Sequence, residues 1–467
     1  MTEGTDRTSK QWSELLGWLE SEDASTGEFK IAMHSSTDGG RSLVAIEDIE
    51  EATKILSLPR SALLDTKTIP KQFIKNHCSE LTSTQALTLF LTVYRLNRRT
   101  SKDLEKFEYP FSCYLSTLPA DISQIPLVWQ LRAVFGSLEE IDPGDLAQLD
   151  RLRTALTTTN SFTFYQLMTT TTIKQSNDVL SRFINDWANL LPTLRDCYPD
   201  ARLGELLWSW LIVNTRCVSF PIGAKNSADN IALAPAFDMA NHSPVSKVTA
   251  VATPQTLTMY SSTPQVNLNA RAGPPPSYQS LAAPCQPRFM KGQEITFSYG
   301  PHSNSTLLTE YGFVASEPNP WDSIDVTDEI VALFDHSNPT HITKIELLKN
   351  TGYWEDYTIQ CNPLESSHRI LVALRLLHSS EEKISEWQDH IDGLVDELEG
   401  EIEQAVQCSL AELFALLKAR SRALVESIAR PDIDPSSLGL SAYAIMCLKT
   451  LASNEMTAVS SYPSETT

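Results

Sequence analysis

Three polar residues lie where two short apolar segments end, and together they could bind and orient a small charged ligand. Asn241 and His242 follow an apolar run that begins at Leu233, and Tyr299 follows another that begins after Gly292. An amide, an imidazole and a phenol provide hydrogen-bonding groups of fixed geometry. The chain contains no Gly-x-Ser-x-Gly elbow, no His-Glu-x-x-His pair, no phosphate loop and no dinucleotide fingerprint after a strand. The residues alone therefore indicate an enzyme-sized α+β protein that is not a hydrolase of a familiar type.

The charge balance of the chain argues for a basic partner. The 467 residues include 58 acidic and 37 basic side chains, which gives a formal charge of -21. A strongly negative surface repels a nucleic-acid backbone and raises the encounter rate with basic proteins. We therefore expect no nucleic-acid binding and a basic protein partner, such as a ribosomal protein or a histone tail. Acidity that serves solubility alone is the plainer alternative.

The cysteines and the hydropathy pattern point to a reduced compartment. Eight cysteines lie far apart and form no Cys-x-x-Cys pair, so we expect neither a disulfide framework nor a metal site. The N-terminus has no apolar signal segment, and no run of about 18 apolar residues occurs. These patterns predict a soluble, monomeric protein of the cytoplasm, the nucleus or both.

The elements that must position the three polar residues follow from periodicity. Alternation predicts strands, and spacing of three and four residues predicts helices. The strands are expected at 29–33, 42–46, 231–234, 247–253 and 256–260, and the helices at 11–20, within 81–191, and at 205–216, 368–377 and 384–402. Residues 262–287 are rich in Pro, Ser, Ala and Gln and predict a flexible loop.

Two further features carry charge. Arg216 lies in the extended segment into which an apolar helix runs, and in such apolar surroundings an arginine must find a carboxylate or carbonyl groups because an unpaired buried charge is costly. Between Glu381 and Glu403, ten carboxylates accompany one basic residue, Lys383, beside an apolar seam. Such a stretch is either a solvated helix face or a dock for a basic substrate.

The ordered motifs resemble those of SET-domain protein methyltransferases. Asp238 to Ser243 is similar to their Asp-x-x-Asn-His-Ser motif, Lys291 to Gly300 to their Gly-Glu-Glu motif that ends in Tyr-Gly, and Glu310 to Phe313 to the closing segment. Gly39 to Ala45 resembles the first strand motif, and Trp208 to Arg216 resembles the motif that ends in Thr/Ser-Arg. The long helical insertion is typical of the Rubisco-methyltransferase branch, and the nearest subgroup is SET domain-containing protein four.

This resemblance implies an α+β fold with a split SET β-core that is interrupted by a helical insertion and followed by a C-terminal all-helical substrate-binding domain. The implied parts are an N-terminal helix with the first part of the core at 1–75, the insertion at 76–204, the second part of the core with the cofactor and lysine site at 205–316, the C-terminal domain at 317–452, and a disordered tail at 453–467.

The resemblance also implies methyl transfer from S-adenosyl-L-methionine to a protein lysine. Tyr299 would be the catalytic residue and would orient the methyl group and the amine. The cofactor would contact Gly39, Gly40, Arg41, Arg216, Asn241, His242 and Tyr299, and Arg216 would meet the cofactor carboxylate. The substrate lysine would lie among Val218, Tyr311, Phe313 and Asp238, and the alternative for Asp238 is that it holds the strand geometry.

Some positions depart from the family pattern and leave alternatives open. Ser42 replaces a common glycine, and Val218 stands where many relatives place an aromatic residue. A histidine methyltransferase of this branch would be expected to carry an amide at Val218, so the sequence favours lysine. A SET-like binding module without activity is the remaining alternative, although Asn241, His242 and Tyr299 are all present.

Overall fold

The computed structural model describes residues 3–35, 40–102, 109–158, 162–261, 288–315, 318–394, 400–430 and 438–463. The chain forms two compact units, each built from separate stretches of sequence. The first consists of Met1–Ile122, Val134–Thr157 and Ser181–Pro301, and the second of Ser123–Ala133, Thr158–Leu180 and His302–Thr467. Residues distant in sequence therefore share one core in each unit.

The described part of the first unit contains a four-stranded sheet in the order β1-β2-β9-β6, a three-stranded sheet in the order β3-β8-β7, and the pair β4-β5. The strands are β1 (Ile31–Ser35), β2 (Arg41–Ala45), β3 (Lys54–Pro59), β4 (Cys217–Ser219), β5 (Ile231–Leu233), β6 (Asn241–His242), β7 (Val248–Ala252), β8 (Thr256–Ser261) and β9 (Glu294–Phe297). All five predicted strand regions are confirmed, because alternation places one side-chain row on the core.

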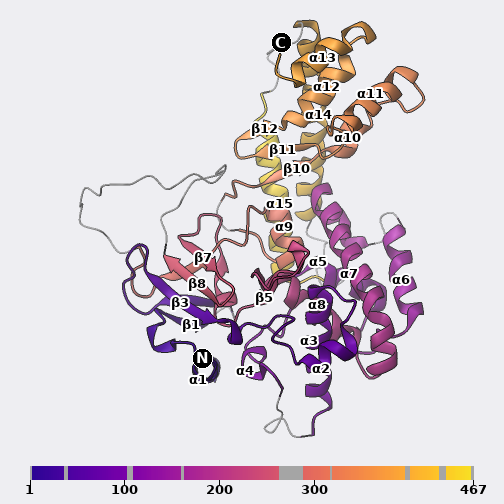
Figure 1. Cartoon of the computed structure of the whole chain (residues 1–467). Helices are drawn as coiled ribbons and strands as arrows, with labels where there is room; N and C mark the ends of the chain where they lie inside the picture. The colour runs from indigo at the N-terminus through magenta and orange to yellow at the C-terminus, as the bar shows by residue number, and fades with distance from the viewer. Residues whose placement is uncertain are drawn as a thin grey trace. The chain divides into compact units, whose positions relative to one another are not determined.

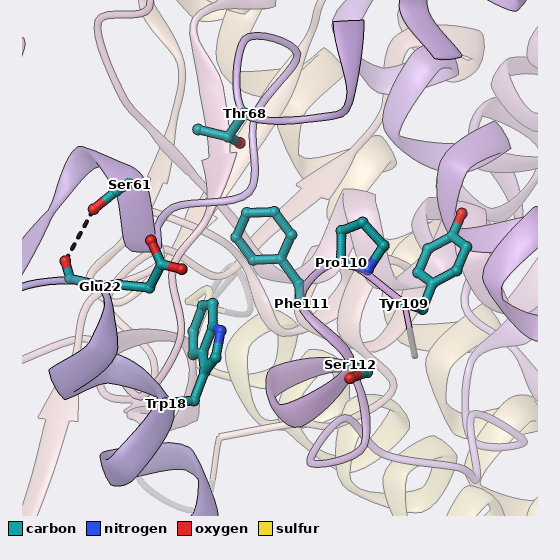
Figure 2. Close-up of a pocket in the computed structure, with 8 residues that line it drawn as sticks. All are labelled: Trp18, Glu22, Ser61, Thr68, Tyr109, Pro110, Phe111 and Ser112. Atoms are coloured by element: carbon teal, nitrogen blue, oxygen red, sulfur yellow. Dashed lines mark hydrogen bonds between the residues drawn. The ribbon is translucent and has the colours of Figure 1, made fainter. Parts of the chain in front are cut away.

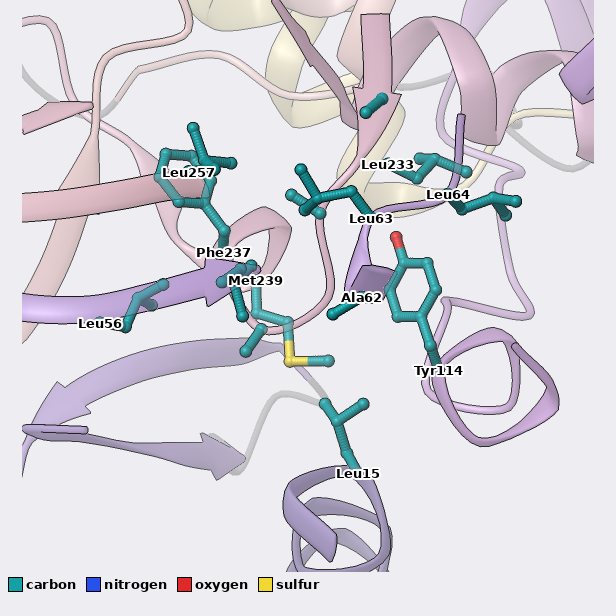
Figure 3. Packing of buried hydrophobic residues seen from close by; sticks show 14 of the residues in the cluster. Leu15, Leu56, Ala62, Leu63, Leu64, Tyr114, Leu233, Phe237, Met239 and Leu257 are labelled. Carbon is teal, nitrogen blue, oxygen red and sulfur yellow. The ribbon is translucent and has the colours of Figure 1, made fainter. Parts of the chain in front are cut away.

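The core of the first unit lies between these small sheets and the helices beside them. In the four-stranded sheet, Met33 of β1 pairs with Leu43 of β2, and Leu43 pairs with Ile295 of β9. All three side chains are buried, and they belong to one cluster that includes Leu15 of α1 (Glu3–Ser21). Figure 3 shows Leu15 pointing toward Met239 in this cluster. The packing fixes β2, which begins with the predicted site residue Arg41, and β9, which Tyr299 follows two residues later.

Helix α1 packs beside β1 and contacts α4, whereas the other helices of the first unit lie on the side away from β3, β7 and β8 (Figure 1). They are α2 (Lys71–His77), α3 (Ser83–Thr100), α4 (Ser112–Leu115), α6 (Leu146–Thr157) and α8 (Leu203–Arg216), while α5 (Pro126–Phe135) and α7 (Thr170–Cys197) contribute residues to both units. A capping box between Thr82 and Gln85 begins α3. The apolar run from Glu205 forms α8 as predicted, but the helix includes Arg216, which the sequence placed in the extended segment that follows; that segment is β4.

The second unit is mainly helical and has its own core around Trp387, Phe414 and Leu374. Its helices are α9 (Asn304–Thr306), α10 (Thr327–Val331), α11 (Pro339–Asn350), α12 (His368–His378), α13 (Ile384–Ile391), α14 (Gly400–Ile428) and α15 (Ala442–Ser460). The C-terminal region also contains a three-stranded sheet of β10 (Ser323–Asp325), β11 (Thr358–Cys361) and β12 (Leu364–Ser366). The prediction of an all-helical domain missed this sheet because strands of three or four residues are too short to show alternation.

The fold class is α+β, as predicted. One sequence expectation is wrong, and another concerns residues that the structure does not describe. The tail predicted to be disordered from 453 onward is helical to Ser460, because Val459 is buried in the core of the second unit. The Pro-rich segment 262–287 and Gly39 lie outside the described residues. The boundaries at 76, 205, 317 and 453 stay predictions.

Candidate active site

The pairing of β6 with β9 brings the two polar motifs together. Asn241 lies opposite Thr296, and His242 lies opposite Phe297, in a parallel arrangement. Just beyond β6, the backbone amide of Ser243 donates a hydrogen bond of 3.1 Å to the carbonyl of Phe297. Main-chain hydrogen bonds therefore fix the register between segments that are distant in sequence.

Tyr299 contacts the β6 segment through its backbone and its side chain. Its backbone amide donates a hydrogen bond of 3.1 Å to Nδ1 of His242. Its hydroxyl donates a hydrogen bond of 2.8 Å to the carbonyl of Ala240. The two rings lie 5.1 Å apart between centroids, at 51°. Because Nδ1 accepts a hydrogen bond, a neutral His242 carries its proton on Nε2.

Asn241 connects β6 with the start of β2. Its Nδ2 donates hydrogen bonds of 2.9 Å to the carbonyl of Arg41 and 2.8 Å to Oε1 of Glu294. The Arg41 guanidinium, in turn, donates from Nη1 to the carbonyl of Thr117 in the segment after α4. Gly40 immediately precedes β2 and is exposed. The structure thus places Arg41, and Gly40 before it, next to Asn241, and their predicted role in one cofactor site stays a prediction.

A buried carboxylate lies behind these residues. Oδ2 of Asp238 accepts hydrogen bonds from the Tyr114 hydroxyl at 2.8 Å and from Nη1 of Arg216 at 3.3 Å. Nη1 also donates to the Asp238 carbonyl at 2.9 Å. Oδ1 of Asp238 is buried and has no hydrogen-bond partner among the described residues. This carboxylate therefore joins α4 to the end of α8 and retains one oxygen for another donor.

The electrostatics of this group are set mainly by burial. Burial raises the pKa of Asp238 above its ordinary value, although Arg216 and Tyr114 oppose the shift. Burial and the nearby Asp238 charge raise the pKa of Tyr114 well above its usual range. Tyr114 is therefore a neutral hydrogen-bond donor at physiological pH. The predicted need of Arg216 for a carboxylate partner is met inside the protein.

Val218 lies close to this group along the chain. It belongs to β4 and pairs with Ala232 of β5, and it packs against the main core cluster while remaining half-buried. Burial and the Asp238 charge raise the pKa of the neighbouring Cys217 thiol. The assignment of Val218 and Asp238 to a lysine channel stays a prediction.

Tyr311 and Phe313 belong to the second unit. Tyr311 ends the π-helical turn η6 (Leu307–Tyr311), and its ring lies 6.2 Å from that of Phe313 between centroids. Gly312 between them has φ +82°, and a Cβ there would lie 2.9 Å from Ile125. Glycine is required at this turn because a side chain would be strained and would clash. The predicted role of the two rings as pocket walls stays a prediction.

The sequence analysis gave no role to Tyr114 or Glu294. Tyr114 is fully buried and donates to Asp238, and Glu294 accepts from Asn241. No local pattern assigns such partners, because each pair joins segments more than fifty residues apart. Within the described residues no group of His, Cys, Asp or Glu side chains is arranged to hold a metal ion, and no helix is long and apolar enough to cross a bilayer.

Comparisons with known proteins place these features in a family context. Residues 322–452 match the Ribosomal lysine N-methyltransferase 2 C-terminal domain family. The chain is 28% identical over 353 residues to Ribosomal lysine N-methyltransferase set11 of Schizosaccharomyces pombe, covering 75% of this chain and 71% of that protein. It is 24% identical over 402 residues to SET domain-containing protein 4 of Homo sapiens, covering 82% and 76%.

Solved structures show the same fold. The crystal structure of the SET domain of LSMT bound to MeLysine and AdoHcy superimposes with a TM-score of 0.59 at 16% identity, covering 96% of this chain and 90% of that one. The structure of Rubisco LSMT bound to AdoMet gives a TM-score of 0.58 at 18% identity with the same coverage. At these low sequence identities the comparison shows a shared fold and nothing further.

Proposed function

We propose that this chain, a SET-domain protein of the Rubisco-methyltransferase type, transfers a methyl group from S-adenosyl-L-methionine to a lysine side chain of a ribosomal protein. The observation that carries the proposal is the cluster in which Asn241 and His242 are paired with β9, and Nδ1 of His242 accepts a hydrogen bond from the backbone amide of Tyr299. Relatives of similar sequence are named ribosomal lysine N-methyltransferases. A monomer in the cytoplasm or nucleus would meet such a substrate.

The residues present fit S-adenosyl-L-methionine. That group, when bound, supplies an electrophilic methyl on a sulfonium, together with a carboxylate, an amine and an adenine. Among the described residues, the Arg216 guanidinium uses only Nη1, so Nε and Nη2 are available for a carboxylate. Oδ1 of Asp238 is a buried acceptor without a partner. Asn241, His242, Gly40 and Arg41 would hold the remaining polar parts.

The protein contributes alignment to the transfer. Tyr299 is half-buried, and its hydroxyl is fixed by the Ala240 carbonyl at 2.8 Å. A phenol fixed in this way would orient the amine and the methyl group. It need not act as a strong base, because correct alignment of the two reacting groups by itself lowers the barrier of a displacement. The attacking lysine must be neutral, and a site with little water next to a positive charge lowers the pKa of an amine.

The acceptor is proposed to be basic because the chain carries a formal charge of -21. The match of residues 322–452 to a domain of a ribosomal lysine methyltransferase favours a ribosomal protein over a histone tail. The structure pairs Glu403 of the acidic stretch with Arg375, at 2.7 Å, so that carboxylate has an internal partner. The acidic stretch therefore offers only part of its charge to a substrate.

A methyl-transfer assay tests the proposal. Purified protein is incubated with tritiated S-adenosyl-L-methionine and, separately, with ribosomal proteins, core histones and a neutral control protein. We expect label in a ribosomal protein, located on lysine by amino-acid analysis. Tyr299→Phe should abolish the label, and Tyr260→Phe, which lies on β8, should retain it.

Three results would contradict the proposal. Label only in histones would reject the ribosomal substrate, and label in 3-methylhistidine would favour the histidine alternative. Cofactor binding without label in any protein would favour a SET-like binding module.

A further inference from the structure

A groove of about 750 Å³ opens in the first unit between the end of α1, the segment after β3 and the segment before α4 (Figure 2). Its lining consists of Trp18, Glu22, Ser61, Thr68, Tyr109, Pro110, Phe111 and Ser112. None of these residues belongs to the cluster of Asn241, His242 and Tyr299. The volume lies in the range of specific ligand sites and would accommodate a few residues of a peptide.

Aromatic side chains form one wall of this groove. The rings of Trp18 and Phe111 meet edge to face, with centroids 5.5 Å apart at 64°. Phe111 has φ +62°, a left-handed conformation that a bulky residue rarely adopts. The Tyr109 hydroxyl donates to the Phe90 carbonyl at 3.0 Å, and burial raises the pKa of Tyr109, so this phenol is neutral. The faces of such rings attract cations.

The only carboxylate in the lining is that of Glu22. The Ser61 hydroxyl donates to the Glu22 carbonyl at 2.9 Å and fixes the backbone. No described residue forms a hydrogen bond or an ion pair with the Glu22 carboxylate, and the lining contains no Lys, Arg or His. Figure 2 shows the carboxylate on the same side as the rings of Trp18 and Phe111. Helix α1 ends at Ser21, and its C-terminal carbonyls add partial negative charge.

We propose that this groove binds a lysine side chain of the basic protein substrate, with the alkylammonium group between the half-buried Trp18 ring on one side and the Glu22 carboxylate on the other, while the buried Phe111 holds the Trp18 ring in place. The inference rests on the proposed function, because it gives the basic substrate a second contact outside the transfer site. Aromatic rings next to one unpaired carboxylate are complementary to an alkylammonium, whereas an acidic or neutral side chain would leave that carboxylate uncompensated.

Binding of short peptides tests the groove independently of methyl transfer. Fluorescein-labelled pentalysine, the same peptide with trimethylated lysines, and decaproline are titrated with the full chain, and anisotropy is recorded at low and high salt. The variants are Glu22→Gln and Trp18→Leu. Glu14→Gln is the matched control, because it removes the same charge from an exposed position on α1, the helix that Glu22 directly follows.

We expect pentalysine to bind, and both Glu22→Gln and Trp18→Leu to weaken its binding about threefold to tenfold. Glu14→Gln should leave the affinity unchanged. In the methyl-transfer assay, Glu22→Gln should raise KM for the protein substrate and leave kcat unchanged. Glu22→Gln keeps the shape of the side chain, so its result stands even if Trp18→Leu reduces stability.

Several results would overturn the inference. Equal pentalysine affinity in the wild type and all three variants would mean that net charge alone attracts the peptide. Binding of decaproline but not of pentalysine would identify a proline-specific groove instead. If pentalysine binding depends on Glu22 and Trp18 while no protein is methylated, the lysine groove stands and the proposed activity fails; the reverse pattern rejects the groove alone.

Discussion

The backbone amide of Tyr299 donates a hydrogen bond of 3.1 Å to Nδ1 of His242, which lies 57 positions earlier in the chain. The hydroxyl of the same tyrosine donates to the carbonyl of Ala240. Tyr299 is thus held at both ends by one short segment. A phenol held in this way has a defined position toward a ligand at the end of β6.

Removal of the Tyr299 hydroxyl should greatly reduce methyl transfer and only slightly reduce the stability of the fold. In Tyr299→Phe, the Ala240 carbonyl loses its donor, which should cost about 0.5 to 1.5 kcal/mol of unfolding free energy. Methyl transfer should fall by about a hundredfold or more, because a positioned hydroxyl that acts in the transition state is lost. Urea denaturation and the tritium assay measure the two effects. Wild-type activity in this variant would show that the hydroxyl has no role in the transfer.

Asn241→Asp should weaken cofactor binding. The change replaces the Nδ2 donor by an oxygen that faces the Arg41 carbonyl and Oε1 of Glu294, so two attractions become repulsions. We expect the dissociation constant for S-adenosyl-L-methionine, measured by calorimetry, to rise about tenfold or more. Asn189→Asp, an exposed position on α7, serves as the control. An unchanged dissociation constant in Asn241→Asp would remove Asn241 from the predicted cofactor site.

Asp238→Asn should change stability in a pH-dependent way. Burial raises the pKa of Asp238 above 3.8, so the folded chain keeps a proton that the unfolded chain releases. Unfolding free energy should therefore decrease as pH rises from 3.8 through the raised pKa. In Asp238→Asn, this dependence of the unfolding free energy on pH should disappear. At pH 7 the variant should also be less stable by about 1 to 3 kcal/mol, because Arg216 loses its counter-ion. Urea denaturation of the wild type and of Asp238→Asn at several pH values measures this dependence. The same change of unfolding free energy with pH in both proteins would show that Asp238 is not its source.

The cysteines should differ in reactivity. Burial raises the pKa of Cys78 to about 11, and burial also raises that of Cys217, whereas Cys197 and Cys408 are exposed. Because the thiolate is the reacting form, iodoacetamide at pH 8 should label Cys197 and Cys408 before Cys78 and Cys217. Mass spectrometry of peptides at successive times measures the order. Early labelling of Cys78 would show that this part of the first unit opens readily.

A buried glutamate in the second unit should oppose folding at high pH. Glu455 of α15 is 7% exposed, and its Oε1 accepts a hydrogen bond of 2.8 Å from the Ser421 hydroxyl of α14. Burial raises its pKa, so stability falls as pH rises through that raised value. Glu455→Gln keeps an acceptor for Ser421 and should stabilise the chain by about 1 kcal/mol at pH 8 and have no effect at pH 4. Equal effects at both pH values would exclude the charge as the cause.

Local patterns predicted much of the fold. The alternation at 29–33 and 256–260 predicted strands, and the apolar spacing at 205–216 predicted α8, because periodicity depends on neighbours along the chain. The sheet of β10, β11 and β12 was missed, and the helix to Ser460 was read as a disordered tail. Both depend on burial against distant residues, which the polar composition of short segments does not reveal.

The sequence by itself determined which residues are the candidates for the chemistry: an Asn-His pair, one tyrosine and an arginine that needs a carboxylate, in an order that resembles SET-domain enzymes. Only the tertiary structure decided the partners. It joined Arg216 to Asp238, placed the Tyr114 hydroxyl on the same oxygen, and paired β6 with β9. The physical reason is that hydrogen-bond partners are selected by the path of the whole chain, whereas residue type and spacing act only locally.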